Sequence, residues 1–234
     1  MNSNRIILIR HSYDDHSYID GKNDTSLTAN GIEIAKEAAI RIVPTINKEN
    51  VIIRYSSKQR AKETAIILSE ELEKKGFNYN CLEDKDLTEL YQGKLNFGDM
   101  VHKDRVDFLQ SCWDDFENCR KNGNLNHHFG ELKSKQIVER PGECHKEWSA
   151  RIATGIQHIL TDIENENTES ITITHRGAIL LMQNLFKIIN NLENFENVEK
   201  YETIWMDYCK DFSIQINNTE HAKTRINNFI KKRR

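Results

Sequence analysis

The sequence predicts an α/β protein: a three-layer α/β/α sandwich with a mostly parallel sheet and a helical insertion. Short β-branched apolar runs alternate along the chain with longer stretches whose apolar residues recur at helical spacing. The 234 residues suffice for one domain with a well-buried core, and 2 Pro and 10 Gly leave little linker material. We therefore expect residues 1–234 to form a single domain, with the insertion at about residues 90–141.

The first third of the chain predicts three strands and two helices. Residues 5–10 (RIILIR) are apolar at successive positions, as in a strand buried on both faces of a parallel sheet. Thr28 suits the N-cap of the first helix, which has Ile32 on its apolar face. Gly76 is a C′ signal that ends the second helix. The predicted elements are a strand at 5–10, a helix at 28–47, a strand at 51–55, a helix capped by Ser56 and Ser57 and reaching about Lys75, and a strand at 78–82.

The rest of the chain continues the alternation after an insertion. Aromatic residues spaced between polar runs predict that residues 87–142 are largely helical with loops. A helix at 143–165 has an apolar face that includes Trp148 and Ile156. The remaining predicted elements are a strand at 170–174, a helix at 177–190, strands at 202–208 and 212–216 that form an edge hairpin, and a final helix at 219–230.

The composition excludes several classes of protein. A net charge of −3 provides no global basic field of the kind that holds nucleic acid. The five cysteines are scattered without a C-x-x-C pair, which favours reduced thiols over a disulfide framework or a zinc site. No apolar run approaches the roughly 20 residues that a membrane span needs, and the amino end lacks a signal-peptide core. We expect a cytoplasmic protein without a nucleic-acid or membrane partner.

Cationic side chains follow three of the predicted parallel strands. The first strand runs into Arg10 and His11, the second is followed by Arg60, and the strand at 170–174 runs into His175 and Arg176. Ligands of open α/β sheets bind beyond the carboxyl ends of the strands, so we expect these groups to converge there. Guanidinium and imidazole groups gathered at one place suit a dianion such as a phosphoryl group.

The same residue types could also catalyse phosphoryl transfer. A neutral imidazole can act as a nucleophile and carry the phosphoryl group, which splits hydrolysis into two easier steps. A carboxylic acid must then protonate the leaving alkoxide. Glu89 follows the third predicted strand and is the candidate acid, and its surroundings would raise its pKa.

Six motifs in the same order resemble the histidine phosphatase superfamily, which includes the cofactor-dependent phosphoglycerate mutases and many small phosphatases. The motifs are ILIRHS at 7–12, DTSLTANG at 24–31, YSSKQRAKETA at 55–65, LTELYQG at 87–93, PGECHKEWSAR at 141–151 and ITHRG at 173–177. They span most of the chain.

The resemblance implies a role for each matching residue. Arg10, Arg60 and His175 would form the phosphate pocket, with His11 as the phosphorylated nucleophile. His175 would also be a catalytic residue, together with His11 and Glu89. Glu89 would act first as the acid and then as the base that activates water. The resemblance implies no metal and no cofactor, because guanidinium groups neutralise the phosphate charge.

Four positions depart from the family pattern. Ser12 replaces the usual glycine beside the nucleophile, and Cys144 stands where the family has serine. Ser17 lies near the offset of an asparagine that often contacts phosphate, so we include it as a phosphate contact; a solvated loop hydroxyl is the alternative. Cys144 is expected to be a buried inert thiol. Arg176 is an additional cation that could contact a phosphate or carboxylate, or point to solvent.

Three functions are compatible with these residues. The first is a metal-independent phosphomonoester hydrolase that acts through a phosphohistidine. The second is mutase-type phosphoryl transfer, ranked lower because Gln92 occupies the offset of a mutase tyrosine and no Arg-Arg pair precedes the last two residues. The third is a non-catalytic phosphate-binding or interaction protein, suggested by Ser12 and the divergent insertion.

The substrate is expected to be a small phosphorylated molecule or a phosphoprotein. The insertion is expected to cap the pocket and to select the leaving group. A homodimer is an open alternative to a monomer, since the edge strand near Trp205 could pair with a second copy.

Overall fold

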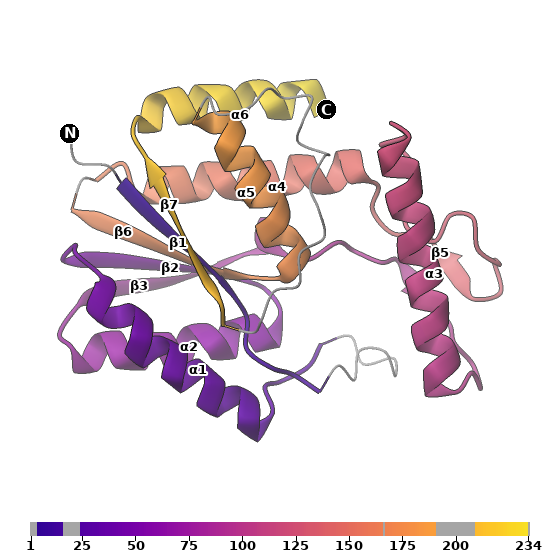
Figure 1. Cartoon of the computed structure of the whole chain (residues 1–234), viewed down its shortest axis with the longest axis horizontal. Helices are drawn as coiled ribbons and strands as arrows, with labels where there is room; N and C mark the ends of the chain where they lie inside the picture. Colours follow the sequence, from indigo (N-terminus) through magenta and orange to yellow (C-terminus); the bar gives the residue numbers. More distant parts are fainter. Residues whose placement is uncertain (1–3, 16–23, 166, 191–208, 234) are drawn as a thin grey trace.

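A five-stranded sheet lies between two layers of helices in the computed structural model, which describes residues 4–15, 24–165, 167–190 and 209–233 (Figure 1). The strand order is β3-β2-β6-β1-β7, and β7 alone runs antiparallel, on β1. The strands are β1 (Asn4–Arg10), β2 (Asn50–Ser56), β3 (Asn78–Asp84), β6 (Thr168–Thr174) and β7 (Asp211–Ile216). The predicted α/β sandwich with a mostly parallel sheet is confirmed.

The helices divide between the two faces of the sheet. α1 (Ala29–Ile42) and α2 (Gln59–Lys74) cover one face, while α4 (His145–Asp162), α5 (Arg176–Ile189) and α6 (Thr219–Arg233) cover the other (Figure 1). Each face has its own apolar core, because alternate residues of the strands point to opposite sides. Ile6 and Leu8 of β1 belong to the core under α4–α6, and Ile7 and Ile9 to the core under α1 and α2.

Helix boundaries agree with the sequence at some ends and differ at others. Thr28 is the N-cap of α1, as predicted, and its side chain accepts a hydrogen bond from the Gly31 N–H. The prediction that this helix reaches Asn47 is wrong: α1 ends at Ile42 and a short 3₁₀ helix, η2 (Val43–Thr45), follows. Pro44 lacks the N–H that a continuing helix needs. Ile32, expected on the apolar face, is 37% exposed.

The N-terminal end of α2 also differs from the prediction. Its N-cap is Lys58, and no side chain caps it. Ser56 is instead the last residue of β2, and its hydroxyl contacts a ring nitrogen of His175. Gly76 follows the helix with a φ of 77°, so the predicted glycine stop is confirmed.

The insertion contains one helix and a small sheet. α3 (His102–Lys121) and the antiparallel pair β4 (Lys94–Leu95) and β5 (Val138–Arg140) lie on the side toward which β1 and β6 point (Figure 1). A second 3₁₀ helix, η3 (Lys85–Leu87), precedes them. The predicted helix and loops are present. The two-stranded sheet was not predicted, because its strands are too short to show an alternating apolar pattern.

The carboxyl-terminal elements follow the predicted order. β7 is the antiparallel edge strand, whereas the expected partner strand at 202–208 and Trp205 lie outside the described residues. The predicted apolar face of α4, including Trp148 and Ile156, is buried. Among the residues that the structure describes, no helix is long and apolar enough to cross a membrane.

Candidate active site

The carboxyl ends of three neighbouring strands bring the predicted cationic residues together. Arg10 ends β1 and is paired in register with Thr174, the last residue of β6. The His11 N–H donates to the Thr174 carbonyl at 2.9 Å, and His175 follows directly. Arg60 lies in the first turn of α2, immediately after β2. Both histidines are at least 95% buried, and Arg10 is 9% exposed.

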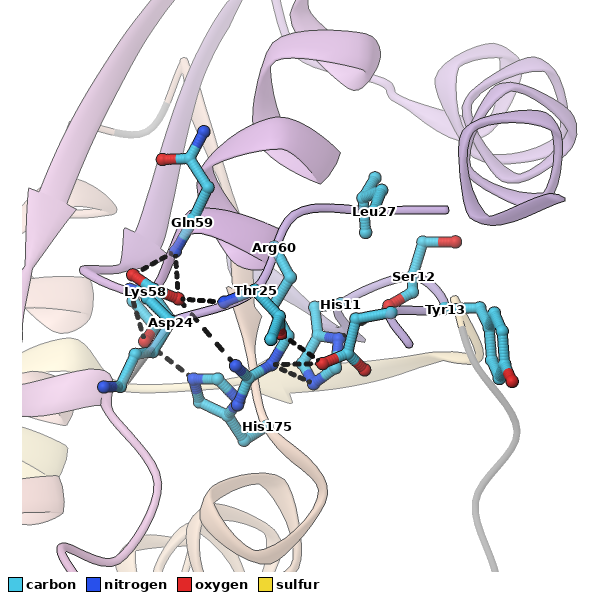
Figure 2. A network of polar contacts seen from close by, with 12 residues as sticks. His11, Ser12, Tyr13, Asp24, Thr25, Leu27, Lys58, Gln59, Arg60 and His175 are labelled. Atoms are coloured by element: carbon cyan, nitrogen blue, oxygen red, sulfur yellow. Dashed lines mark hydrogen bonds and ion pairs between the residues drawn. The ribbon is translucent and has the colours of Figure 1, made fainter. Parts of the chain in front are cut away.

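One guanidinium group joins the two imidazole rings. The Arg60 Nε lies 3.1 Å from His11 Nε2, and a terminal nitrogen of Arg60 lies 3.3 Å from His175 Nδ1 (Figure 2). The ring centroids of the two histidines are 4.9 Å apart. Because a guanidinium only donates hydrogen bonds, each facing imidazole nitrogen must be an unprotonated acceptor.

The other ring nitrogens agree with this assignment. His11 Nδ1 lies 2.7 Å from the Ser12 carbonyl, which accepts its proton, and His175 Nε2 lies 2.8 Å from the Ser56 hydroxyl. Both rings are therefore neutral, with one acceptor nitrogen each facing the guanidinium. Burial lowers the pKa of His175 well below its ordinary value; a proton on His11 would lower it further, as do the charges of Arg60, Lys58 and Arg10.

Two carboxylates also lie beside the guanidinium of Arg60. Asp14 and Asp24 each place an oxygen 3.9 Å from a nitrogen of Arg60. Asp24 also accepts the Gln59 N–H at 2.9 Å (Figure 2). The Thr25 hydroxyl donates to Asp14. These groups hold Arg60 from the loop that precedes α1. Sequence reasoning did not assign either aspartate to the site, although Asp24 begins one of the six motifs.

Glu89 is held at the N-terminus of α5. One carboxylate oxygen accepts the Gly177 N–H at 2.9 Å, and the other accepts the Leu90 N–H at 3.0 Å. A Cβ on Gly177 would lie 2.6 Å from the nearer Glu89 oxygen, so the absence of a side chain permits this approach. Burial raises the pKa of Glu89, while the two backbone hydrogen bonds and the charges of Arg151 and Arg60 act in the opposite direction.

The four residues that depart from the family pattern lie in different surroundings. The buried Ser12 hydroxyl donates to the Gly31 carbonyl at 2.6 Å, and the Ser12 N–H donates to the Thr64 hydroxyl at 3.0 Å, so this side chain has its own space beside α1. Cys144 is buried at the N-cap of α4, and burial raises the pKa of its thiol. Arg176 is the first residue of α5 and half-buried. Ser17 lies outside the described residues.

Two clusters in the described part of the chain bring together side chains that can ligate metals. They are His128, Cys144 and Glu147, and Asp84, Asp86 and His158. Neither contains a candidate residue of the phosphate pocket. In the second cluster, Asp84 is engaged by Arg54 at 3.3 Å and by His158 at 2.7 Å, which accounts for its burial without an ion.

The fold, together with the arginine and histidine side chains gathered beyond β1, β2 and β6, defines an α/β protein whose candidate site suits a phosphoryl group. The family model of the histidine phosphatase superfamily (branch 1) matches residues 6–208, and the chain belongs to this superfamily. The expected recognition and the enzyme class, a phosphatase, are thereby confirmed. No curated protein matches the chain in sequence.

Solved structures share the fold at low sequence identity. A mycobacterial glucosyl-3-phosphoglycerate phosphatase is 15% identical with a TM-score of 0.58, and the match covers 90% of this chain and 89% of that one. The α-ribazole phosphatase of Shigella flexneri is 22% identical with a TM-score of 0.54, covering 92% of each chain. YhfR of Bacillus stearothermophilus is 16% identical with a TM-score of 0.61, covering 92% and 93%. These likenesses show the phosphoglycerate mutase-like fold.

Proposed function

We propose that this protein is a phosphomonoester hydrolase that works without a metal and passes through a phosphohistidine at His11. The observation that carries the proposal is the direction of the His11 lone pair. Its Nδ1–H is committed to the Ser12 carbonyl, so the unprotonated Nε2 faces the Arg60 guanidinium. A phosphoryl group bound by that guanidinium would lie in front of the nucleophilic nitrogen.

The first step forms the phosphoenzyme. Arg10 and Arg60 bind the phosphoryl oxygens, together with the neutral His175 and Ser17. The His11 Nε2 lone pair forms the bond to phosphorus as the bond to the ester oxygen breaks. Glu89 gives its proton to that oxygen, and its raised pKa favours the protonated form that an acid needs.

The second step regenerates the enzyme. The Glu89 carboxylate takes a proton from water, the water oxygen attacks phosphorus, and the bond to His11 Nε2 breaks. Inorganic phosphate then leaves. The two solved phosphatases above carry names of small phosphorylated substrates, glucosyl-3-phosphoglycerate and α-ribazole phosphate, which supports a small phosphomonoester as substrate here. Residues 90–141 would select its leaving group as a cap within one domain.

The free cysteines bear on the compartment. All five are unpaired by disulfides, and three of them are buried. This supports the proposal of a cytoplasmic protein, where thiols stay reduced.

The test is hydrolysis of p-nitrophenyl phosphate by the purified protein in the presence of EDTA. We expect phosphate release from the wild type, and its loss in His11→Ala. The matched control is His221→Ala, which changes an exposed histidine of α6 and should keep the wild-type rate. Turnover that survives in His11→Ala would overturn the nucleophile. Binding of phosphate or vanadate without any turnover by the wild type would favour the non-catalytic alternative.

A further inference from the structure

The proposed acid, Glu89, lies in a segment that has no regular secondary structure. Residues 88–93 belong to neither a helix nor a strand, so strand or helix hydrogen bonds do not fix their backbone. The segment is partly buried, with Leu90 fully so, and its shielded N–H and carbonyl groups need other partners. The position of the Glu89 carboxylate therefore depends on whatever supplies those partners.

Arg151 of α4 supplies partners for the carbonyls of Thr88 and Glu89 in this segment. One terminal nitrogen, whose two hydrogens are shared among several acceptors, lies 3.2 and 3.0 Å from the carbonyl oxygens of Asp86 and Thr88 and 2.7 Å from the Thr88 hydroxyl. The other donates to the Glu89 carbonyl at 3.1 Å. A single planar guanidinium thus contacts three residues around the acid, which a point charge could not do with the same geometry.

Glu143 orients that guanidinium and holds the other end of the segment. Its two carboxylate oxygens accept Arg151 Nε at 2.8 Å and a terminal nitrogen at 2.7 Å. One of them also accepts the Tyr91 N–H at 2.9 Å, and the Tyr91 carbonyl accepts the Glu143 N–H at 2.8 Å. Both side chains are less than 20% exposed, so water competes little for these bonds.

The backbone is packed closely where these two segments meet. A Cβ on Gly142 would lie 2.1 Å from the Tyr91 carbonyl oxygen, and a Cβ on Gly93 would lie 2.2 Å from the Arg140 carbonyl oxygen. These contacts are between backbone atoms, which cannot move aside as a flexible side chain can. The Glu143–Arg151 pair therefore sits at the base of the insertion, where its first and last residues touch.

We propose that Glu143 and Arg151 act together as positioning residues for the general acid Glu89. This inference rests on the proposed function. It extends that function from the groups that touch the substrate to the pair of residues that orients the Glu89 carboxylate. Neither residue is needed to bind the phosphoryl group. Their loss should therefore impair protonation of the leaving group more than it impairs attack by His11.

The test compares two esters that differ in their need for an acid. An alkyl phosphate such as glycerol 2-phosphate leaves as a strongly basic alkoxide, whereas p-nitrophenyl phosphate leaves as a stabilised phenolate. The measured quantity is kcat/KM, since it covers the steps through formation of the phosphoenzyme. A general acid contributes about 10²- to 10⁴-fold, and only where the leaving group needs a proton.

The variants are Glu143→Gln, Arg151→Lys and their combination. A shift of about 1 Å in a catalytic group costs about 100-fold, so we expect kcat/KM for the alkyl ester to fall about 10- to 100-fold in each single variant. For p-nitrophenyl phosphate the fall should be less than about threefold, because little protonation is required. Since the two residues act as one unit, the double variant should lose no more than either single variant.

The matched control is Glu169→Gln at the amino end of β6. Glu169 accepts Arg5 Nε at 2.5 Å and the Asn47 N–H at 3.2 Å, so it repeats the chemistry of Glu143 at the amino ends of the parallel strands, opposite to the candidate site. Its replacement should destabilise the fold to a similar degree without any preference between esters. Equal losses on both esters in Glu143→Gln, matching those in Glu169→Gln, would assign the pair a structural role alone and overturn the inference.

The same assay separates failure of this inference from failure of the proposed function. Glu89→Gln should show the strongest loss on the alkyl ester and a small loss on p-nitrophenyl phosphate. If Glu89→Gln shows no ester preference, Glu89 is not the acid, and the acid step of the proposed function is wrong together with this inference. If Glu89→Gln shows the preference and Glu143→Gln and Arg151→Lys do not, only the positioning role is wrong.

Discussion

Replacing Gly177 by alanine should separate catalysis from stability at the proposed acid. In the folded protein the new Cβ would lie 2.6 Å from one Glu89 carboxylate oxygen and 3.0 Å from the other. Ordinary contact begins at 3.4 Å, so the nearer oxygen must move by about 0.8 Å. Because the carboxylate moves as a unit, the displacement also stretches the 2.9 Å hydrogen bond that the other oxygen accepts from the Gly177 N–H, which fixes the carboxylate at the N-terminus of α5.

The magnitude follows from the size of this shift. A misplacement of about 1 Å in a catalytic group costs about 100-fold, which corresponds to about 3 kcal/mol of transition-state stabilisation. The clash involves the end of a flexible side chain, so the fold can accommodate it. Alanine is also a better helix former than glycine by up to about 1 kcal/mol, so the free energy of unfolding should not fall.

The assay combines two measurements on Gly177→Ala. The kcat/KM for an alkyl phosphate should fall about 100-fold, while the Tm should equal or exceed that of the wild type. In a Glu89→Gln background the same substitution should have little further effect on kcat/KM, because the group that it displaces is already inactive. Wild-type kcat/KM in Gly177→Ala would refute the placement of the acid at this helix terminus.

Three further substitutions test other parts of the structure by urea unfolding. The pKa of His175 is depressed in the folded protein, so at low pH the unfolded chain binds a proton that the folded protein does not. The free energy of unfolding should therefore fall as the pH falls below about 6.5, and His175→Asn should flatten this dependence. Gly31→Ala would place a Cβ 2.0 Å from the Tyr13 carbonyl oxygen, a backbone atom, and should cost about 1–3 kcal/mol. Thr28→Ala removes the N-cap hydrogen bond of α1 and should cost about 1 kcal/mol. An unchanged urea midpoint in either of the last two, or an unchanged pH dependence in His175→Asn, would contradict these contacts.

Much of the fold could be predicted because its signals are local. The apolar runs that became β1, β2 and β6 are buried in the sheet, and the helical periodicity of α4 placed Trp148 and Ile156 in the core. The signals failed where a long-range contact decided the outcome. Ser56 resembles a helix cap in sequence, but its hydroxyl contacts His175, which is 119 residues away.

The candidate site divides in the same way. Arg10, His11, Arg60 and His175 could be grouped because parallel strands end at one edge of a sheet, and the structure brings these four together. Asp14 could not be assigned, since one of two adjacent aspartates in a polar loop carries no periodic signal. The contact of the Glu143–Arg151 pair with the Glu89 segment could not be predicted either, because Arg151 and Glu89 are 62 residues apart in the sequence.

Trapping the phosphoenzyme tests the central claim most directly. The protein would be mixed with p-nitrophenyl phosphate, quenched within one turnover under alkaline conditions that preserve phosphohistidine, and digested for mass spectrometry. The account predicts one phosphoryl group on the ring of His11, and none in the His11→Ala variant. A phosphoryl group on any other residue, or hydrolysis by a wild type whose His11 stays unmodified throughout the turnover, would contradict it.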